Sequence, residues 1–246
     1  MKKIAKLLCL FMAICLVFAC AGCGGKDTLV MGTNASFPPY EFTDNDGKIV
    51  GIDAEIAAAV AEKMGYELEI KDMEFDSLLT AVQNGSIDFA LAGMTVTDER
   101  KQEVNFSDTY ATGVQVIIVK EGSAIATPDD LKNKKIGVQA GTTGDIYCTG
   151  DYGQENVKQY QNGALAVAAL ANGQVDCVVI DNEPAKNYVE ANKGLKILKT
   201  EYITEDYAAA IAKDNDKLLK DFNDALKKLK EDGTIDKIIS KYITAE

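Results

Sequence analysis

The only arginine of the chain, Arg100, follows a segment in which a strand is expected to end at Gly93 and a helix to begin after Thr97. A guanidinium group offers two parallel N–H bonds that match a carboxylate. Gly93 lets a ligand approach the backbone, and Thr95 adds a hydroxyl and an N–H group. The alternative is an exposed helix arginine paired with a neighbouring acid. Because every other basic side chain is a lysine, we expect Arg100 to bind a carboxylate.

A second charged residue, Asp181, ends the apolar run Val178-Val179-Ile180. Ligands of open α/β sheets bind at the carboxyl ends of strands, so this carboxylate is well placed to bind an ammonium group. The alternative role is an N-cap of the following helix.

Two further segments carry polar or aromatic groups next to glycine or proline. Residues 139–144 (Gln-Ala-Gly-Thr-Thr-Gly) predict a glycine turn at a helix start, whose N–H groups suit an anion, although a plain helix cap is the commoner meaning. In residues 34–42, two prolines hold aromatic side chains in a rigid loop. Phe37 is expected to form an apolar wall there, Phe42 to pack in the core, and Phe75 to add a second aromatic surface.

The composition excludes several classes of function. The chain has no histidine, which removes Ser-His-Asp and Cys-His catalysis and the commonest metal ligand. It also lacks a P-loop, a G-x-G-x-x-G segment and a paired-cysteine zinc spacing, so no cofactor and no metal are expected. The net charge is −12, and the first 22 residues contain three lysines and no acid. The more acidic remainder argues against nucleic acid as a partner.

Strands and helices are expected to alternate. Apolar runs at residues 29–31, 67–70 and 87–92 predict strands, and residues 53–64 and 77–83 predict helices. This alternation is typical of an α/β fold with mainly parallel sheets.

An internal repeat predicts two lobes. Residues 78–88, a helix followed by Asn-Gly and a strand that opens with aspartate, recur as residues 167–176. Two copies are too few for a solenoid, and they fit two similar α/β lobes.

The chain would cross between these lobes twice. Residues 115–119 would carry it into the second lobe, residues 202–207 would bring it back, and helices between residues 218 and 242 would complete the first lobe. Arg100 and Asp181 belong to opposite copies of the repeat. Opposite charges that face each other across a cleft suit a zwitterion, and an α-amino acid fits this description.

The N-terminus predicts export. Three lysines precede residues 7–21, an apolar run without charge that is too short for a comfortable membrane span, which indicates a cleavable signal peptide of residues 1–22. An uncleaved anchor helix is the alternative. Ala21-Gly22-Cys23 resembles a lipobox, in which Cys23 is acylated and anchors the protein to a membrane surface, and Cys20 is the alternative attachment site.

The remaining Cys148 and Cys177 suit either one disulfide or, as we expect, two separately buried thiols.

Five segments together resemble the polar amino-acid branch of the bacterial extracellular solute-binding proteins, family 3, which capture ligands for ABC importers. They are, in chain order, GTNASFPPYEF, AGMTVTDER, NFSD, GTTG and VVID. The resemblance implies an α/β, two-lobed, periplasmic-binding-protein-like (type II) clamshell with hinge crossings near residues 110–114 and 204–207. It places residues 23–112 and 206–246 in lobe 1 and residues 113–205 in lobe 2.

The resemblance also implies a ligand site. Arg100 would bind the α-carboxylate with help from the Gly93 segment and the GTT turn, Asp181 would bind the α-ammonium, and Phe37 and Phe75 would flank the side chain. The expected ligand-binding residues are Asn34, Phe37, Phe75, Gly93, Met94, Thr95, Arg100, Gln139, Thr142, Thr143 and Asp181. Asn34 stands where related binders often have aspartate, and Gln139 stands where glutamine binders have lysine. The first departure argues against lysine, arginine or histidine and favours a neutral polar or sulfur-containing ligand side chain. The second weakens the case for glutamine.

The resulting prediction is a monomeric, extracytoplasmic lipoprotein that binds a free amino acid and delivers it to the membrane permease of an ABC importer. It is expected not to be an enzyme. The alternatives are a cleft enzyme of the same fold, such as a cyclohexadienyl dehydratase, and a sensory amino-acid-binding protein.

Overall fold

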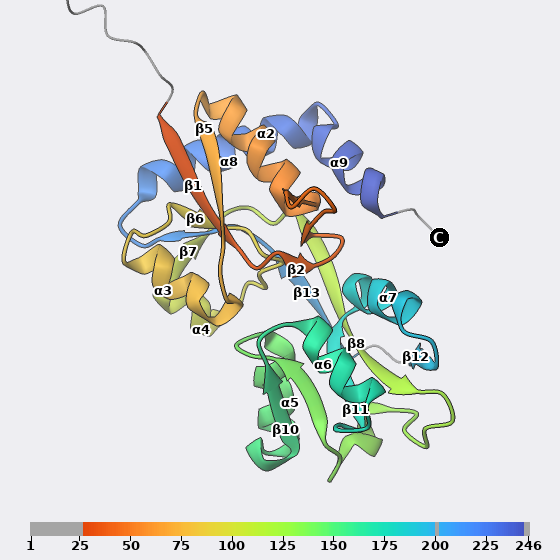
Figure 1. Cartoon of the computed structure of the whole chain (residues 1–246). Coiled ribbons are helices and arrows are strands. Elements are labelled where there is room, and N and C mark those ends of the chain that lie inside the picture. Colours follow the sequence, from red (N-terminus) through yellow and green to blue (C-terminus); the bar gives the residue numbers. More distant parts are fainter. Residues whose placement is uncertain (1–26, 200–201, 244–246) are drawn as a thin grey trace, which may run out of the picture.

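The computed structural model describes residues 27–199 and 202–243. These residues form two α/β lobes that are joined by a pair of adjacent strands (Figure 1). The predicted signal peptide and the lipid attachment at Cys23 lie outside these residues. No helix in the described residues is both long and apolar enough to span a membrane.

Lobe 1 is built on a five-stranded sheet in the order β5-β1-β6-β14-β7. Its strands are β1 (Thr28–Thr33), β5 (Glu67–Asp72), β6 (Phe89–Ala90), β7 (Val104–Phe106) and β14 (Ala210–Ala212). A small antiparallel sheet adds β2 (Ser36–Phe37), β3 (Glu41–Thr43) and β4 (Ile49–Val50). The helices are α2 (Ile52–Met64), η1 (Phe75–Ser77, a 3-10 turn), α3 (Leu78–Gln83), α4 (Asp98–Glu103), α8 (Asp216–Glu231) and α9 (Thr234–Tyr242).

Lobe 2 is built on a six-stranded sheet in the order β10-β9-β11-β8-β12, with β13 also paired to β8. The strands are β8 (Ala111–Lys120), β9 (Ile136–Gln139), β10 (Val157–Tyr160), β11 (Cys177–Asp181), β12 (Leu195–Ile197) and β13 (Ile203–Tyr207). The helices are η2 (Pro128–Leu131), α5 (Thr143–Tyr152), η3 (Gln154–Asn156), α6 (Gly163–Ala171) and α7 (Asn182–Ala191).

Both sheets are mixed rather than mainly parallel. The pairs β1–β5, β1–β6, β9–β10 and β9–β11 are parallel, as helical crossovers require. The strands β8 and β14 run antiparallel to their neighbours, because each belongs to a segment that enters a sheet from the other lobe. The predicted helix–strand alternation is therefore confirmed, whereas the expectation of mainly parallel pairing is only partly right.

The internal repeat has the same structural basis in both lobes. Asp88, just before β6, accepts a hydrogen bond from the Val30 N–H at 2.7 Å, and Asp176, just before β11, accepts one from the Lys135 N–H at 2.8 Å. Each aspartate thus satisfies a backbone donor at the neighbouring strand, which explains why the same residue opens both copies.

The strands β8 and β13 are the connection between the lobes. They pair antiparallel from Ile203 opposite Gln115 to Tyr207 opposite Ala111. The two segments that the family resemblance implied as hinges therefore lie side by side. Beyond this connection, helix α8 packs against α2 of lobe 1, with Phe222 and Leu226 fully buried.

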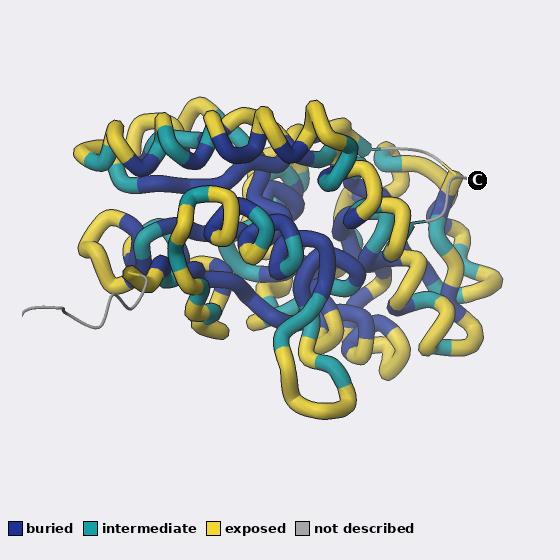
Figure 2. Tube along the Cα trace, turned by 90° about the horizontal axis from the view of Figure 1, so that it is seen from above, coloured by how far each residue is buried: buried dark blue, intermediate teal, exposed yellow. Residues whose placement is uncertain are grey.

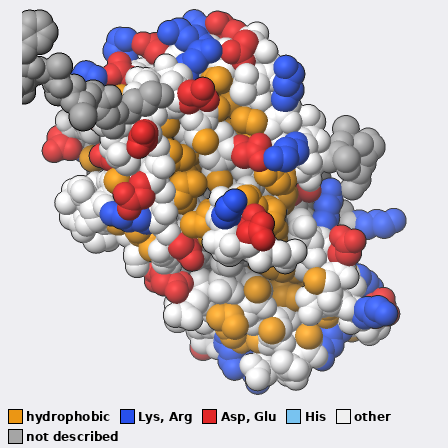
Figure 3. Space-filling model, turned by 45° about the horizontal axis from the view of Figure 1, so that its top comes forward, with side chains coloured by type: hydrophobic (Ala, Val, Ile, Leu, Met, Phe, Trp, Pro, Cys, Tyr) orange, Lys and Arg blue, Asp and Glu red, His pale blue; other side chains and the backbone are white. Residues whose placement is uncertain are grey.

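The buried residues follow the strands and the inner faces of the helices, and the exposed residues cover the outside (Figure 2). On the face in Figure 3, acidic and basic side chains are interspersed. Cys148 and Cys177 are both free and buried in one apolar cluster of lobe 2, which confirms two buried thiols rather than a disulfide. Burial raises the pKa of both thiols above their ordinary value, so they behave as small apolar side chains.

Candidate ligand-binding site

A cavity with about 310 Å³ of empty space, part of it open to solvent, lies between the lobes. All the residues predicted for the ligand site line it except Met94, and Glu41 and Ala92 join them. The lining residues are Asn34, Phe37, Glu41, Phe75, Ala92, Gly93, Thr95, Arg100, Gln139, Thr142, Thr143 and Asp181. The Met94 side chain is instead fully buried in an apolar cluster of lobe 1.

Arg100 is a buried cation, with 6% of its surface exposed. Its N–H groups donate to the Thr95 carbonyl at 2.7 Å and, across the cleft, to the Gly141 carbonyl at 3.0 Å. Thr97 caps helix α4 as predicted, since its hydroxyl accepts the Arg100 N–H. Arg100 forms no ion pair with any described carboxylate, so the alternative of an exposed, paired arginine is wrong. Burial lowers the pKa of Arg100, as expected for a cation without an adjacent counter-charge.

Asp181 ends β11 on the opposite lobe and is also buried. It stands at the N-cap position of α7, yet its side chain makes no capping bond. Its carboxylate instead accepts hydrogen bonds from the Tyr207 hydroxyl and from the Gln115 amide, the latter at 2.8 Å. Burial raises the pKa of Asp181 to about 7, which these two donors counteract. A ligand ammonium would supply the positive charge that the ionised form lacks.

The GTT turn caps a helix and also lines the cavity. Thr142 is the N-cap of α5, where its hydroxyl accepts the Asp145 N–H at 3.3 Å, so the plain cap is real. Both Thr142 and Thr143 nevertheless line the cavity, at the positive end of the α5 dipole. The arrangement leaves this helix start facing the same space as Arg100.

Two amide side chains meet across the cleft away from the charged pair. Gln139 of lobe 2 donates through Nε2 to Asn34 Oδ1 of lobe 1 at 3.0 Å, and Asn34 donates to the Met73 carbonyl at 2.9 Å. Both side chains are buried. These are the two positions at which the sequence departs from related binders, and they lie in direct contact.

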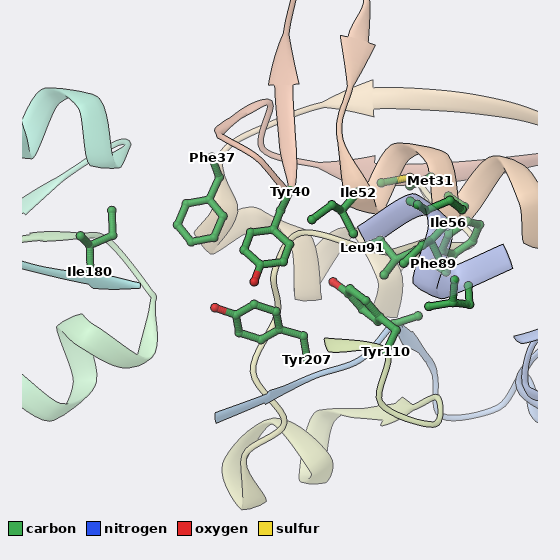
Figure 4. Close-up of a cluster of buried hydrophobic side chains, with 14 of the residues drawn as sticks. Met31, Phe37, Tyr40, Ile52, Ile56, Phe89, Leu91, Tyr110, Ile180 and Tyr207 are labelled. Carbon is green, nitrogen blue, oxygen red and sulfur yellow. The ribbon is translucent and has the colours of Figure 1, made fainter. Parts of the chain in front are cut away.

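Aromatic rings form the apolar part of the wall. The Phe75 ring lies 5.5 Å from the Arg100 guanidinium carbon, and Phe37 stacks on Tyr40 with centroids 5.9 Å apart. Figure 4 shows Phe37, Tyr40, Tyr110 and Tyr207 drawn together from separate elements. Phe37 also explains Gly93, because a Cβ there would come within 2.9 Å of its ring, and the φ of +53° favours glycine.

A buried carboxyl pair was not predicted from the sequence. Glu41 lines the cavity, and Asp53 behind it accepts hydrogen bonds from the Tyr110 hydroxyl at 2.6 Å and the Gly93 N–H at 2.8 Å. Burial and the Asp53 charge raise the pKa of Glu41 well above its usual range, and burial raises that of Asp53 to about 6. One oxygen of each carboxyl is buried without a described donor, so a proton held between the two groups would satisfy both.

A second unpredicted group lies under Asp181. Gln115, Glu205 and Tyr207 are buried on the connecting strands β8 and β13 and reach the residues of the cavity wall. In the described part of the chain, no cluster of three or more acidic or cysteine side chains has the arrangement of a metal site. What the geometry provides is a polar, mostly enclosed space with a cation on one side and a carboxylate on the other.

Two lobes that close on such a space define a ligand-binding protein of the clamshell type. Residues 29–245 match the model of the bacterial extracellular solute-binding proteins, family 3, and the chain belongs to this family. The probable histidine-binding protein of Neisseria gonorrhoeae is 36% identical over 94% of this chain and 93% of its own length. The arginine-binding extracellular protein ArtP of Bacillus subtilis is 37% identical over 98% of this chain and 99% of its own.

Solved structures agree in fold. An ancestral arginine-binding protein bound to glutamine superposes with a TM-score of 0.85 at 43% identity, covering 89% of this chain and 99% of that one. The predicted two-lobed α/β fold is thereby confirmed, and these relatives are named as binding proteins rather than enzymes.

Proposed function

We propose that the cleft captures one free α-amino acid with a polar side chain and delivers it to the permease of an ABC importer. The main support for this proposal is a pair of buried, oppositely charged groups on opposite walls of one cavity, Arg100 and Asp181. A zwitterion fits this pair, because its carboxylate would replace the carbonyl partners of Arg100 and its ammonium would neutralise Asp181.

The ligand side chain would then face Asn34, Gln139 and Glu41. The substitution of aspartate by Asn34 favoured a neutral polar or sulfur-containing side chain, but Glu41 restores a carboxyl group to the same cavity. We therefore propose a side chain that donates hydrogen bonds, of the guanidinium, imidazole or amide type. Relatives named for histidine and arginine, and a related structure bound to glutamine, support this choice, whereas the relative named for L-cystine in Escherichia coli supports the sulfur-containing alternative.

A thermal-shift screen against the standard amino acids and cystine tests the ligand class. A ligand that binds only the folded state raises the melting temperature by mass action. Arginine, histidine or glutamine should give the largest shift. A shift with cystine alone would instead support the sulfur-containing alternative, and no shift with any amino acid would contradict the proposal.

Truncation of the arginine tests the site. Arg100→Ala should weaken binding of the best ligand by at least about 100-fold, since removing one partner of a buried charge pair costs about 3 kcal/mol or more. Lys101→Ala is the matched control, because Lys101 is the next residue, exposed, and paired only with Asp98. Isothermal titration should show unchanged affinity for the control, and unchanged affinity for both variants would refute the site.

We further propose that the mature chain begins at Cys23 as a lipid-anchored, extracytoplasmic protein. The lipobox-like segment and the extracellular family support this. Mass spectrometry of the mature N-terminus checks it, and lipid on Cys20 would point to the alternative site.

The enzymatic alternative requires a carboxylic acid with a raised pKa, and Asp181 and Glu41 both line the cleft with raised pKa values. We propose that they serve binding, since both oxygens of Asp181 already accept hydrogen bonds. Incubation with prephenate or arogenate should yield no product, whereas turnover would favour the enzyme.

A further inference from the structure

Three adjacent strands bring polar side chains to one face of the lobe 2 sheet. Gln115 of β8 pairs directly with Asp181 of β11, and two residues earlier Gly113 of β8 pairs with Glu205 of β13. Because side chains alternate between the faces of a sheet, Gln115, Asp181 and Glu205 all project to the same side. That side faces the cavity wall.

The Gln115 amide holds two carboxylates at once. Its Nε2 donates to Asp181 Oδ2 at 2.8 Å and to Glu205 Oε2 at 3.0 Å. Glu205 Oε2 also accepts the Thr143 hydroxyl at 2.8 Å. All four side chains are buried, with at most 7% of their surface exposed. Glu205 thus reaches Asp181 through Gln115 and directly contacts Thr143, the first residue of α5, although it does not itself line the cavity.

Building on the proposed function, we propose that Glu205 is a positioning residue for amino-acid binding. Through Gln115 it fixes the orientation of the Asp181 carboxylate, and through Thr143 it fixes the helix start that faces the ligand carboxylate. Since Glu205 lies on one of the two strands that join the lobes, it ties these ligand-facing groups to the connection about which the lobes close. It acts on the α-amino and α-carboxylate groups that all amino acids share, and so it affects affinity rather than selectivity.

The electrostatics of Asp181 provide a signature for this role. The charged and titratable groups around it are Glu205 and Tyr207 on β13, Arg100 on α4, and Tyr40 and Glu41 of lobe 1. Burial raises the pKa of Asp181 to about 7, and the Glu205 charge raises it further, while Tyr207 and Gln115 lower it. A ligand ammonium binds the ionised carboxylate, so affinity should fall as the pH drops below about 7. Removing the Glu205 charge should move this fall to lower pH.

The experiment is isothermal titration of the full chain with L-arginine and with L-glutamine between pH 5 and pH 8. Glu205→Ala should lower the affinity for whichever of the two binds by about tenfold or more, with the ratio of their affinities kept if both bind. Glu205→Gln keeps an acceptor for Thr143 and Gln115, so it should retain more affinity and shift the pH profile downward. Asp206→Asn is the control, because Asp206 is the exposed next residue on β13.

The outcomes separate this inference from the proposed function. Absence of binding by the unaltered chain to every amino acid contradicts the proposed function itself. Binding by the unaltered chain together with an unchanged pH profile in Glu205→Gln overturns the positioning role, even if Glu205→Ala is less stable, because a merely structural residue would not move the titration of Asp181.

Discussion

At the scale of single residues, the cavity wall and the groups behind it are short of positive charge. Glu41, Asp53, Asp181 and Glu205 are all buried, and Arg100 is the one buried cation among the described residues. Desolvation of a carboxylate is costly, and the raised pKa values of the first three show that cost. A ligand ammonium, and a cationic side chain near Glu41, would relieve it. Relief of this desolvation cost would then contribute to affinity.

The substitution Glu41→Gln removes the charge of this side chain and keeps its shape, so it should show the effect of the charge on ligand affinity. Affinity for arginine should fall about tenfold or more while affinity for glutamine changes less, because only a cation gains from the carboxylate. The ligand-free variant should also depend less on pH: the folded-state pKa of Glu41 is raised, so its contribution to stability is present at low pH and is lost as the pH rises above its ordinary value of 4.5. Calorimetric titration and melting curves at pH 5 and 8 measure both effects. Equal losses for arginine and glutamine would contradict the role of Glu41 in selectivity.

At the scale of the elements, strand ends bring the site together. Gly93 follows β6, Gln139 and Asp181 end β9 and β11, and a helix begins directly after Asp181 and a few residues after the other two. Such positions expose backbone groups and short side chains toward the ligand while the strand behind them holds them rigid. The connecting strands add a tighter constraint at Gly113, where the Tyr207 ring and Asp181 occupy the space of a side chain.

Gly113→Ala should therefore damage both the fold and the site. The backbone there does not require glycine, but an added Cβ would meet the Tyr207 hydroxyl and lie 2.7 Å from Asp181 Oδ1. Overpacking of this kind costs about 1–3 kcal/mol and would displace Asp181, so binding of every amino acid should weaken. Gly150→Ala in α5 is the control, since no atom lies within 4 Å of the added Cβ and alanine favours a helix. Denaturant unfolding and titration report the two effects, and full affinity in Gly113→Ala would contradict the constraint.

At the scale of the whole molecule, the sequence predicts those features that follow from the pattern of residues along the chain. The repeat around Asp88 and Asp176 gives two lobes, and polar residues after apolar runs give most of the cavity wall. The burial of an acid cannot be predicted in this way. The spacing of Glu205 and Tyr207 places both side chains on one face of a strand, but it does not show which face is buried. Nothing in the sequence distinguishes Glu41 or Glu205 from the other acids until the lobes are packed together.

Apart from the connecting strands, three hydrogen bonds join the two lobes in the part of the chain that the structure describes. Arg100 donates to the Gly141 carbonyl and Gln139 to Asn34, both within the cavity wall. The third runs from the Tyr188 hydroxyl of α7 to the Ser36 carbonyl of β2, outside the residues that line the cavity. This contact stabilises closure without touching a ligand, so it can be altered independently of the site.

Tyr188→Phe should shift the balance toward the open form and weaken the binding of every amino acid equally. One hydrogen bond contributes about 0.5–1.5 kcal/mol, which corresponds to a loss of affinity of about 2- to 12-fold. Tyr152→Phe is the control, because the Tyr152 hydroxyl donates to the Pro128 carbonyl at 3.0 Å within lobe 2. Stopped-flow measurements should show faster ligand dissociation for Tyr188→Phe and no change for Tyr152→Phe. A loss confined to one amino acid would instead mean that Tyr188 contributes to ligand recognition, and equal losses in both variants would mean that the effect is one of general stability.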